Sequence, residues 1–253
     1  MTNISLTITE AIAEIKLCRP HRMNAVTLEL LKDLRKAIDT VNLNNQINVI
    51  ILSGEGKAFC AGVDLREIEA NSTDVSSGSV GELLDEHANG VIKALESSPK
   101  AVISKINGHC FTGGLEIALA ADLIYVAKDA KLADTHAVLG FRPSWGLSQR
   151  LPRRVSLMRA KELSFTAQII TGEQAKDYGL ALECFPKEKL DAEVLSIAKK
   201  ISGNSPNSIK AYKDLYKAYQ NSGLQSGLEY EASSRYDIPE VEQRVMEFLK
   251  RLR

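Results

Sequence analysis

The sequence predicts an α/β fold. Short apolar or alternating runs, which are typical of strands, alternate with amphipathic helical patterns up to about residue 185, and from Lys187 onward the pattern is helical throughout. With 253 residues, of which 44% are hydrophobic and 25% charged, the chain is long enough for one large globular domain and a smaller extension. We therefore expect an α/β core followed by a helical C-terminal region.

The N-terminal part begins with two runs, residues 4–8 and 13–17, which alternate with period two and predict an antiparallel hairpin. Thr27 has a side chain suited to an N-cap and precedes a segment with one apolar face, so a helix is expected after it. Residues 47–52 form an apolar, mostly β-branched run, which predicts a buried strand.

A first glycine loop, residues 53–65, follows this strand, and Asp64 is placed to cap the helix expected after it. The loop contains a G-x-G triplet without the full dinucleotide fingerprint, which excludes a nicotinamide site. The polar, serine-rich residues 71–79 predict a loop that is a candidate lid, and a helix through Leu84 and Leu95 follows.

A second glycine loop, residues 107–114, follows the apolar run of residues 101–106. It leads into a short predicted helix that is apolar on all sides except for Glu116. A carboxylate in apolar surroundings is costly unless it is paired, protonated or used in chemistry. Glu116 is therefore either a helix-start carboxylate that completes a cap or a general base beside N–H groups that face a developing negative charge.

Loops that follow neighbouring strands of a layered α/β fold meet at one end of the sheet, where ligands bind. The loops at residues 61–64 and at Gly113 could each direct a backbone N–H to the same oxygen, as a carbonyl that becomes an enolate requires. Two ordinary tight turns are the alternative. His136, in the turn-rich residues 133–146, either makes a structural hydrogen bond or is a catalytic group oriented by Asp134.

The remaining pattern predicts a buried strand at residues 123–127, helices at 157–165 and 172–178, and a last short strand at 180–185. Ser205 followed by Pro206 is a typical helix start.

Composition excludes several classes of function. The chain has 32 Lys plus Arg and 32 Asp plus Glu residues. It therefore lacks the excess of basic residues that would indicate a nucleic-acid partner. No apolar run approaches the ~18 residues of a membrane span, and the N-terminus lacks the pattern of a secretory signal. The cysteines and histidines show no metal-type spacing, so we expect four reduced and buried cysteines, no metal and a cytoplasmic location. A nucleophilic Cys60 or Cys110, each beside a glycine loop, is the alternative.

Four segments in this order resemble the crotonase, or enoyl-CoA hydratase/isomerase, superfamily: residues 19–25, 56–65, 107–118 and 139–151. The resemblance implies an α/β spiral of β-β-α turns with a C-terminal helical oligomerisation region. Residues 1–190 would then be the core that holds a CoA-thioester site, and residues 191–253 the helical trimerisation region. It also implies an acyl-CoA thioester as substrate, no cofactor beyond this CoA, and a homotrimer or a dimer of trimers.

The resemblance also implies roles for individual residues. Val63 and Gly113 match the two positions whose backbone N–H groups hold the thioester oxygen, and Glu116 matches the first catalytic glutamate of the hydratases. The positions that contact the CoA moiety are matched by Met23, Ala61, Gly62 and Asp64 and, from a neighbouring subunit, by Phe248.

His136 stands where the best-known hydratases carry a second catalytic glutamate. The resemblance implies an enoyl-CoA hydratase-like lyase, in which Glu116 activates water and His136 donates a proton or orients the water. The alternatives are a Δ3,Δ2-enoyl-CoA isomerase, which needs only one glutamate, and an acyl-CoA-binding oligomer that has lost catalysis.

Overall fold

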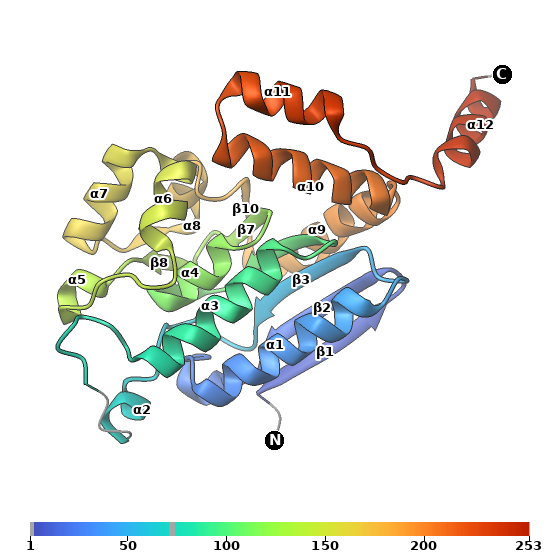
Figure 1. Ribbon diagram of the computed structural model, residues 1–253. Helices are drawn as coiled ribbons and strands as arrows, with labels where there is room; N and C mark the ends of the chain where they lie inside the picture. Colours follow the sequence, from blue (N-terminus) through green and yellow to red (C-terminus); the bar gives the residue numbers. More distant parts are fainter. Residues whose placement is uncertain (1–2, 71–73, 253) are drawn as a thin grey trace.

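Two sheets form the core of the computed structural model, which describes residues 3–70 and 74–252 (Figure 1). The larger sheet has the order β1 (Ile4–Thr9), β2 (Ile12–Leu17), β3 (Val49–Gly54), β5 (Ala101–Ile106), β7 (Leu123–Ala127) and β10 (Glu183–Phe185). The β1–β2 hairpin is antiparallel, as predicted, and the other neighbouring pairs are parallel. β3 and β5 are buried along their whole length, as the apolar runs predicted.

A second, smaller sheet consists of four strands that the sequence analysis missed. Its order is β4 (Ala58–Cys60), β6 (His109–Phe111), β8 (Lys131–Ala133) and β9 (Ile170–Thr171). Runs of two or three residues are too short to show a period of two. Because β3, β5 and β7 enter the large sheet while β4, β6 and β8 enter the small one, the chain winds as a spiral of β-β-α turns. This winding confirms the predicted fold class.

Helices cover both faces of the large sheet. α1 (Leu28–Leu43) lies against β1 and β2, beside α3 (Glu82–Glu96) (Figure 1). Thr27 caps α1 as predicted, its hydroxyl oxygen accepting from the Leu30 N–H at 3.1 Å. α4 (Gly113–Leu119) and α9 (Lys187–Ser202) lie on opposite faces of β5, because Ser104 donates to Ala118 of α4 whereas the adjacent Lys105 reaches Asp191 of α9.

Each predicted glycine loop contains a short strand of the small sheet: β4 lies within residues 53–65 and β6 within residues 107–114. The parts of the two loops that precede the helices therefore follow the neighbouring parallel strands β4 and β6 rather than β3 and β5. The first loop leads from β4 to α2 (Leu65–Ala70), and the second leads from β6 to α4. Of the predicted lid, residues 71–73 lie outside the described residues. Beyond them, the Gly78 carbonyl accepts from the Arg142 N–H at 2.8 Å, which joins this segment to the turn-rich residues 133–146.

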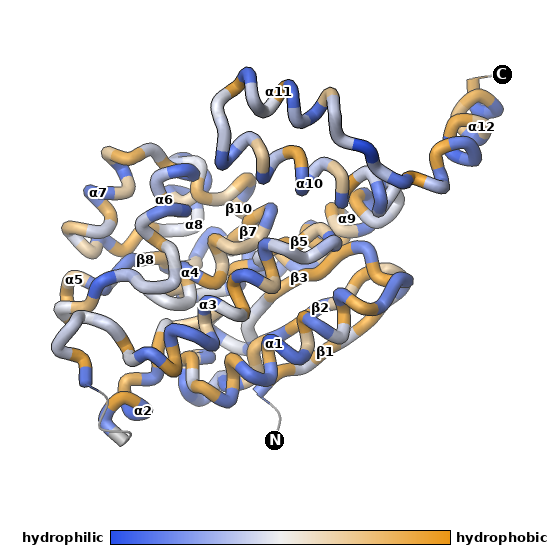
Figure 2. Tube along the Cα trace, in the orientation of Figure 1, coloured by the Kyte–Doolittle hydropathy of each residue, from blue (hydrophilic) through white to orange (hydrophobic). Residues whose placement is uncertain are grey.

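The remaining helices are η1 (Pro20–Arg22), α5 (His136–Leu139), α6 (Leu147–Val155), α7 (Leu157–Thr166), α8 (Gly172–Asp177), α10 (Pro206–Asn221), α11 (Leu224–Ser233) and α12 (Val241–Arg251). The predicted division at residue 190 falls inside α9, which packs on the large sheet through Leu190, Val194 and Ala198. α12 extends away from the rest of the chain and carries hydrophobic as well as hydrophilic positions (Figures 1 and 2). Among the described residues, no helix is long and apolar enough to cross a membrane.

Candidate active site

Glu116 lies in the first turn of α4 with only 1% of its surface exposed. Its Oε1 accepts two hydrogen bonds, from the backbone N–H groups of Trp145 and Leu147, each at 3.0 Å. These donors lie just before α6 and at its first residue, and not in α4. The interpretation of Glu116 as a cap of its own helix was therefore wrong.

Burial raises the pKa of the Glu116 carboxyl above its ordinary value, because a charge loses its hydration there. The N–H of Leu147, the nearby His136 and the N–H of Trp145 oppose this effect without cancelling it, and the charge of Asp134 adds to it. A carboxylate with a raised pKa binds a proton more strongly than an exposed glutamate does. This property suits a group that takes up a proton during a reaction.

His136 connects Glu116 to Asp134. Its Nε2 lies 3.6 Å from Oε2 of Glu116, and its Nδ1 lies 2.6 Å from Oδ1 of Asp134. The same Asp134 oxygen accepts the His136 backbone N–H at 3.2 Å, so ring and backbone are fixed together. The predicted orientation of His136 by Asp134 is thus present in the structure, and both side chains are buried.

Although burial opposes it, the pKa of Asp134 is lowered, because His136 and Ser164 donate hydrogen bonds to its carboxylate. Asp134 is therefore the charged acceptor of the pair. An Nδ1–H donated to Asp134 leaves Nε2 directed at Glu116.

The two glycine loops approach each other closely. A Cβ added at Gly62, whose φ is +93°, would lie 3.5 Å from the backbone nitrogen of Gly113. The Val26 N–H donates to the Gly62 carbonyl at 2.7 Å and the Val26 carbonyl accepts from the Asp64 N–H at 2.9 Å, so the intervening Val63 N–H points away from Val26. Within the described part of the chain, neither the Val63 nor the Gly113 N–H donates to another group.

Glycine is required at residues 113 and 114 by close packing. A Cβ at Gly113 would come within 2.5 Å of the Trp145 ring, and one at Gly114 would come within 2.2 Å of the Cys60 carbonyl oxygen. Thr112, just before them, has φ +50° and ψ −112°, a costly conformation for a β-branched residue. Its hydroxyl lies 2.5 Å from that of Thr135, which joins the second glycine loop to the segment of Asp134 and His136.

The residues expected to contact CoA lie together beside the first glycine loop. The Met23 carbonyl accepts from the Ala61 N–H at 3.0 Å, and 37% of Met23 is exposed. Asp64 pairs with Arg19 at 3.0 Å, and its other oxygen accepts from Arg66 at 3.4 Å, near the start of α2 as predicted. Met23, Ala61, Gly62 and Asp64 therefore lie together, with Gly62 buried and the other three at least partly exposed.

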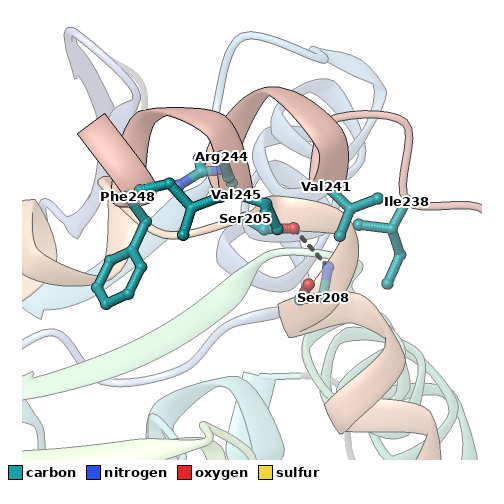
Figure 3. Close-up of a pocket in the computed structure, with 8 residues that line it drawn as sticks. Ser205, Ser208, Ile238, Val241, Arg244, Val245 and Phe248 are labelled. Carbon is teal, nitrogen blue, oxygen red and sulfur yellow. Dashed lines mark hydrogen bonds between the residues drawn. The ribbon is translucent and has the colours of Figure 1, made fainter. Parts of the chain in front are cut away.

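Phe248 is not part of this arrangement within one chain. It lies on α12 and lines a hollow of about 260 Å³ between α12 and the beginning of α10 (Figure 3). It is 62% exposed, and α12 lies far from α4 in Figure 1.

Cys60 and Cys110 are fully buried free thiols, whereas Cys18 and Cys184 are partly exposed, contrary to the expectation that all four are buried. Burial raises the pKa of Cys60 to about 12 and that of Cys110 well above its ordinary value. The reactive thiolate is thus disfavoured at both, which argues against the nucleophile alternative. Among the described residues, no group of three or more His, Cys, Asp or Glu side chains could hold a metal ion.

Sequence reasoning missed the backbone donors of Trp145 and Leu147. The only available signal was the unusual density of turn residues before α6, which does not identify their acceptor. It also missed Asp85, whose carboxylate accepts from the Trp145 indole.

A family model described as enoyl-CoA hydratase/isomerase matches residues 7–251. The chain belongs to this family. It is 35% identical over 223 residues to the peroxisomal Delta(3,5)-Delta(2,4)-dienoyl-CoA isomerase of Arabidopsis thaliana (85% of this chain, 80% of that protein) and 31% identical over 236 residues to the crotonyl-CoA hydratase of Syntrophomonas wolfei (93% and 87%). The crystal structure of an enoyl-CoA hydratase from Bacillus anthracis, 34% identical, superposes with a TM-score of 0.86 (91% and 88%).

Proposed function

We propose that this protein adds water across the double bond of a 2-enoyl-CoA. The observation that carries the proposal is the environment of Glu116. One of its oxygens is fixed by two backbone N–H groups, and the other faces His136, next to the glycine loops of Val63 and Gly113. Forming a thioester enolate requires a base and hydrogen-bond donors for its oxygen. A buried carboxylate beside two N–H groups that are free to donate to an anion meets both requirements.

In the proposed reaction, the Val63 and Gly113 N–H groups bind the thioester oxygen. Oε2 of Glu116 takes a proton from water while the water oxygen bonds to C3 and the C2–C3 π electrons move toward the thioester. If His136 carries protons on both ring nitrogens, C2 takes up its Nε2 proton, and the proton on Glu116 then returns to Nε2, which lies 3.6 Å from Oε2. If His136 only orients the water, Glu116 passes the water proton to C2. Each oxyanion donor contributes on the order of 3–4 kcal/mol in comparable sites, and proton transfer a factor of about 10²–10⁴.

A Δ3,Δ2-enoyl-CoA isomerase is the second candidate, and the replacement of the second carboxylate by His136 favours it. Moving a proton between C2 and C4 requires one base only, which Glu116 supplies. One relative, the Arabidopsis thaliana protein, is named a dienoyl-CoA isomerase, so isomerisation of an acyl-CoA double bond is compatible with membership of this family.

The proposal includes the rest of the binding surface. Met23, Ala61, Gly62 and Asp64 would contact the CoA moiety, and Phe248 would reach the CoA of a neighbouring copy in a trimer or dimer of trimers. The exposure of Phe248 on an extended α12 supports this placement. A cytoplasmic location and the absence of a metal or further cofactor stay predictions.

The test is turnover by purified wild type, Glu116→Gln and His136→Ala on crotonyl-CoA and on a 3-enoyl-CoA. We expect wild type to form 3-hydroxybutyryl-CoA, Glu116→Gln to lose about 10²–10⁴-fold in kcat, and His136→Ala to lose less. Isomerisation without hydration would favour the second candidate. Tight CoA binding without turnover would indicate an acyl-CoA binder, and a fully active Glu116→Gln would exclude the assigned base.

A further inference from the structure

Trp145 contacts two of the residues assigned to the chemistry, Glu116 and Gly113. Its backbone N–H donates to Glu116 at 3.0 Å, and its ring packs against Gly113 so closely that a Cβ there would come within 2.5 Å. Only 1% of Trp145 is exposed, and its backbone carbonyl accepts from Arg150 at 2.7 Å. The position of this residue therefore sets the surroundings of both Glu116 and Gly113.

The indole of Trp145 is held by a carboxylate from another element. Oδ1 of Asp85, on α3, accepts the indole N–H at 2.7 Å and the Ser144 hydroxyl at 2.8 Å. Oδ2 of Asp85 accepts the hydroxyl of Ser79 at 2.5 Å, and Ser79 is itself buried. Hydrogen bonds to a charged acceptor are roughly twice as strong as neutral ones. Asp85 thus joins the segment before α3 to the segment before α6.

We propose that Asp85 is a positioning residue for the reaction. By holding the Trp145 indole, it fixes the N–H that orients the Glu116 carboxylate and the ring that defines the place of Gly113. The proposal rests on the proposed function, because Glu116 and Gly113 are assigned their roles there.

The physical reason is the small tolerance of such a site. Without Asp85 the buried indole N–H loses its acceptor, and the ring can rotate to find another. A displacement of about 1 Å at a reacting group costs on the order of 10²-fold in rate, even when its cause lies outside the site. Trp145 is not among the residues assigned to the CoA moiety, so we expect kcat to change more than KM.

The experiment compares Asp85→Ala, Asp85→Asn, Trp145→Phe and the double variant Asp85→Ala/Trp145→Phe with wild type on crotonyl-CoA. Glu86→Ala is the matched control, because Glu86 is an exposed carboxylate next to Asp85 on α3. Trp145 is the only tryptophan of the chain, so intrinsic tryptophan emission reports its surroundings directly.

We expect Asp85→Ala to shift the emission to longer wavelength and to lower kcat about 10- to 100-fold, with KM within about twofold of wild type. Asp85→Asn should retain most of both properties, because its oxygen accepts from the indole and its amide donates to Ser79. Since Asp85 acts through the indole, the double variant should be no slower than Trp145→Phe alone. Glu86→Ala should match wild type.

If Asp85→Ala had the tryptophan emission and the kcat of wild type, the proposal would be overturned. It would also be overturned if the fold-losses in kcat of Asp85→Ala and Trp145→Phe multiplied in the double variant, because the two residues would then act independently. If wild type turned over no enoyl thioester, the proposed function would fail separately. Tryptophan emission would then replace kcat in the same comparison. An emission of Asp85→Ala equal to wild type would still overturn the positioning role.

Discussion

A glutamate with 1% of its surface exposed is a costly residue for a fold to retain. Here two backbone N–H groups stabilise one oxygen, while the other oxygen has the imidazole of His136, at 3.6 Å, as its one polar partner among the described residues. The fold therefore compensates part of the desolvation and leaves the remainder as a raised pKa. At the residue scale, this incomplete compensation is what we expect of the base proposed for the reaction.

The raised pKa predicts a pH-dependent effect of Glu116→Gln on stability. In wild type, stability associated with Glu116 is fully present below its unfolded pKa and is lost as pH rises through the higher folded pKa, at about 1.4 kcal/mol per unit of difference. The glutamine keeps an oxygen for the two N–H donors but does not titrate. We therefore expect the free energy of unfolding of Glu116→Gln, relative to wild type, to increase from acidic to neutral pH.

Urea denaturation at a series of pH values measures this difference. Asp134, whose pKa is lowered, is present in both proteins and therefore contributes to both curves. Glu86→Gln, at an exposed position, should show no such trend. A difference between Glu116→Gln and wild type that stays constant with pH would contradict the raised pKa.

At the scale of elements, the site depends on how closely α4 approaches β4. The second glycine loop lies so close to β4 that a Cβ at Gly114 would come within 2.2 Å of the Cys60 carbonyl, which is backbone and cannot rotate away. The same close approach places the Gly113 N–H near the loop of Val63. This contact between two elements therefore fixes how far apart the two loops lie that we propose to bind the oxyanion.

This contact predicts that Gly114→Ala destabilises the protein. Alanine gains about 1 kcal/mol in helix propensity, but overpacking against immobile backbone costs about 1–3 kcal/mol or more, so the net effect should be a loss. Gly203→Ala is the control, because φ there is −72° and a Cβ would meet ordinary contacts at 3.5 Å. The midpoint temperature of thermal unfolding of both variants tests this prediction. If Gly114→Ala were as stable as Gly203→Ala, α4 would be able to shift away from β4 and the prediction would be wrong.

At the scale of the whole molecule, one chain contains the proposed chemistry but leaves α12 without an extensive contact to the core. Val241, Val245, Phe248 and Leu249 are each about half or more exposed and line one hollow with the start of α10. An apolar face of this kind is costly in water unless another surface covers it. The proposed trimer would supply such a surface.

We accordingly expect Val245→Glu/Phe248→Glu to lower the molecular mass in solution from that of a trimer or hexamer and to raise KM for the acyl-CoA while the chain remains folded. Sedimentation velocity and circular dichroism measure the two properties. Glu242→Gln on the same helix is the control. A wild-type protein that sediments as a monomer would contradict the predicted assembly without affecting the assignment of Glu116.

The sequence by itself determined the fold class, the long strands and the identity of the candidate base. These features are local: a period of two, an apolar helix and one carboxylate just after a glycine loop can each be recognised within about twenty residues. Only the tertiary structure decided that the Glu116 donors come from residues 29 and 31 positions away and that Asp85 holds a ring 60 positions away. It also decided that the short strands β4 and β6 carry the glycine loops. The physical reason is that a hydrogen bond between distant segments leaves no periodic trace in either of them, whereas burial of a whole face does.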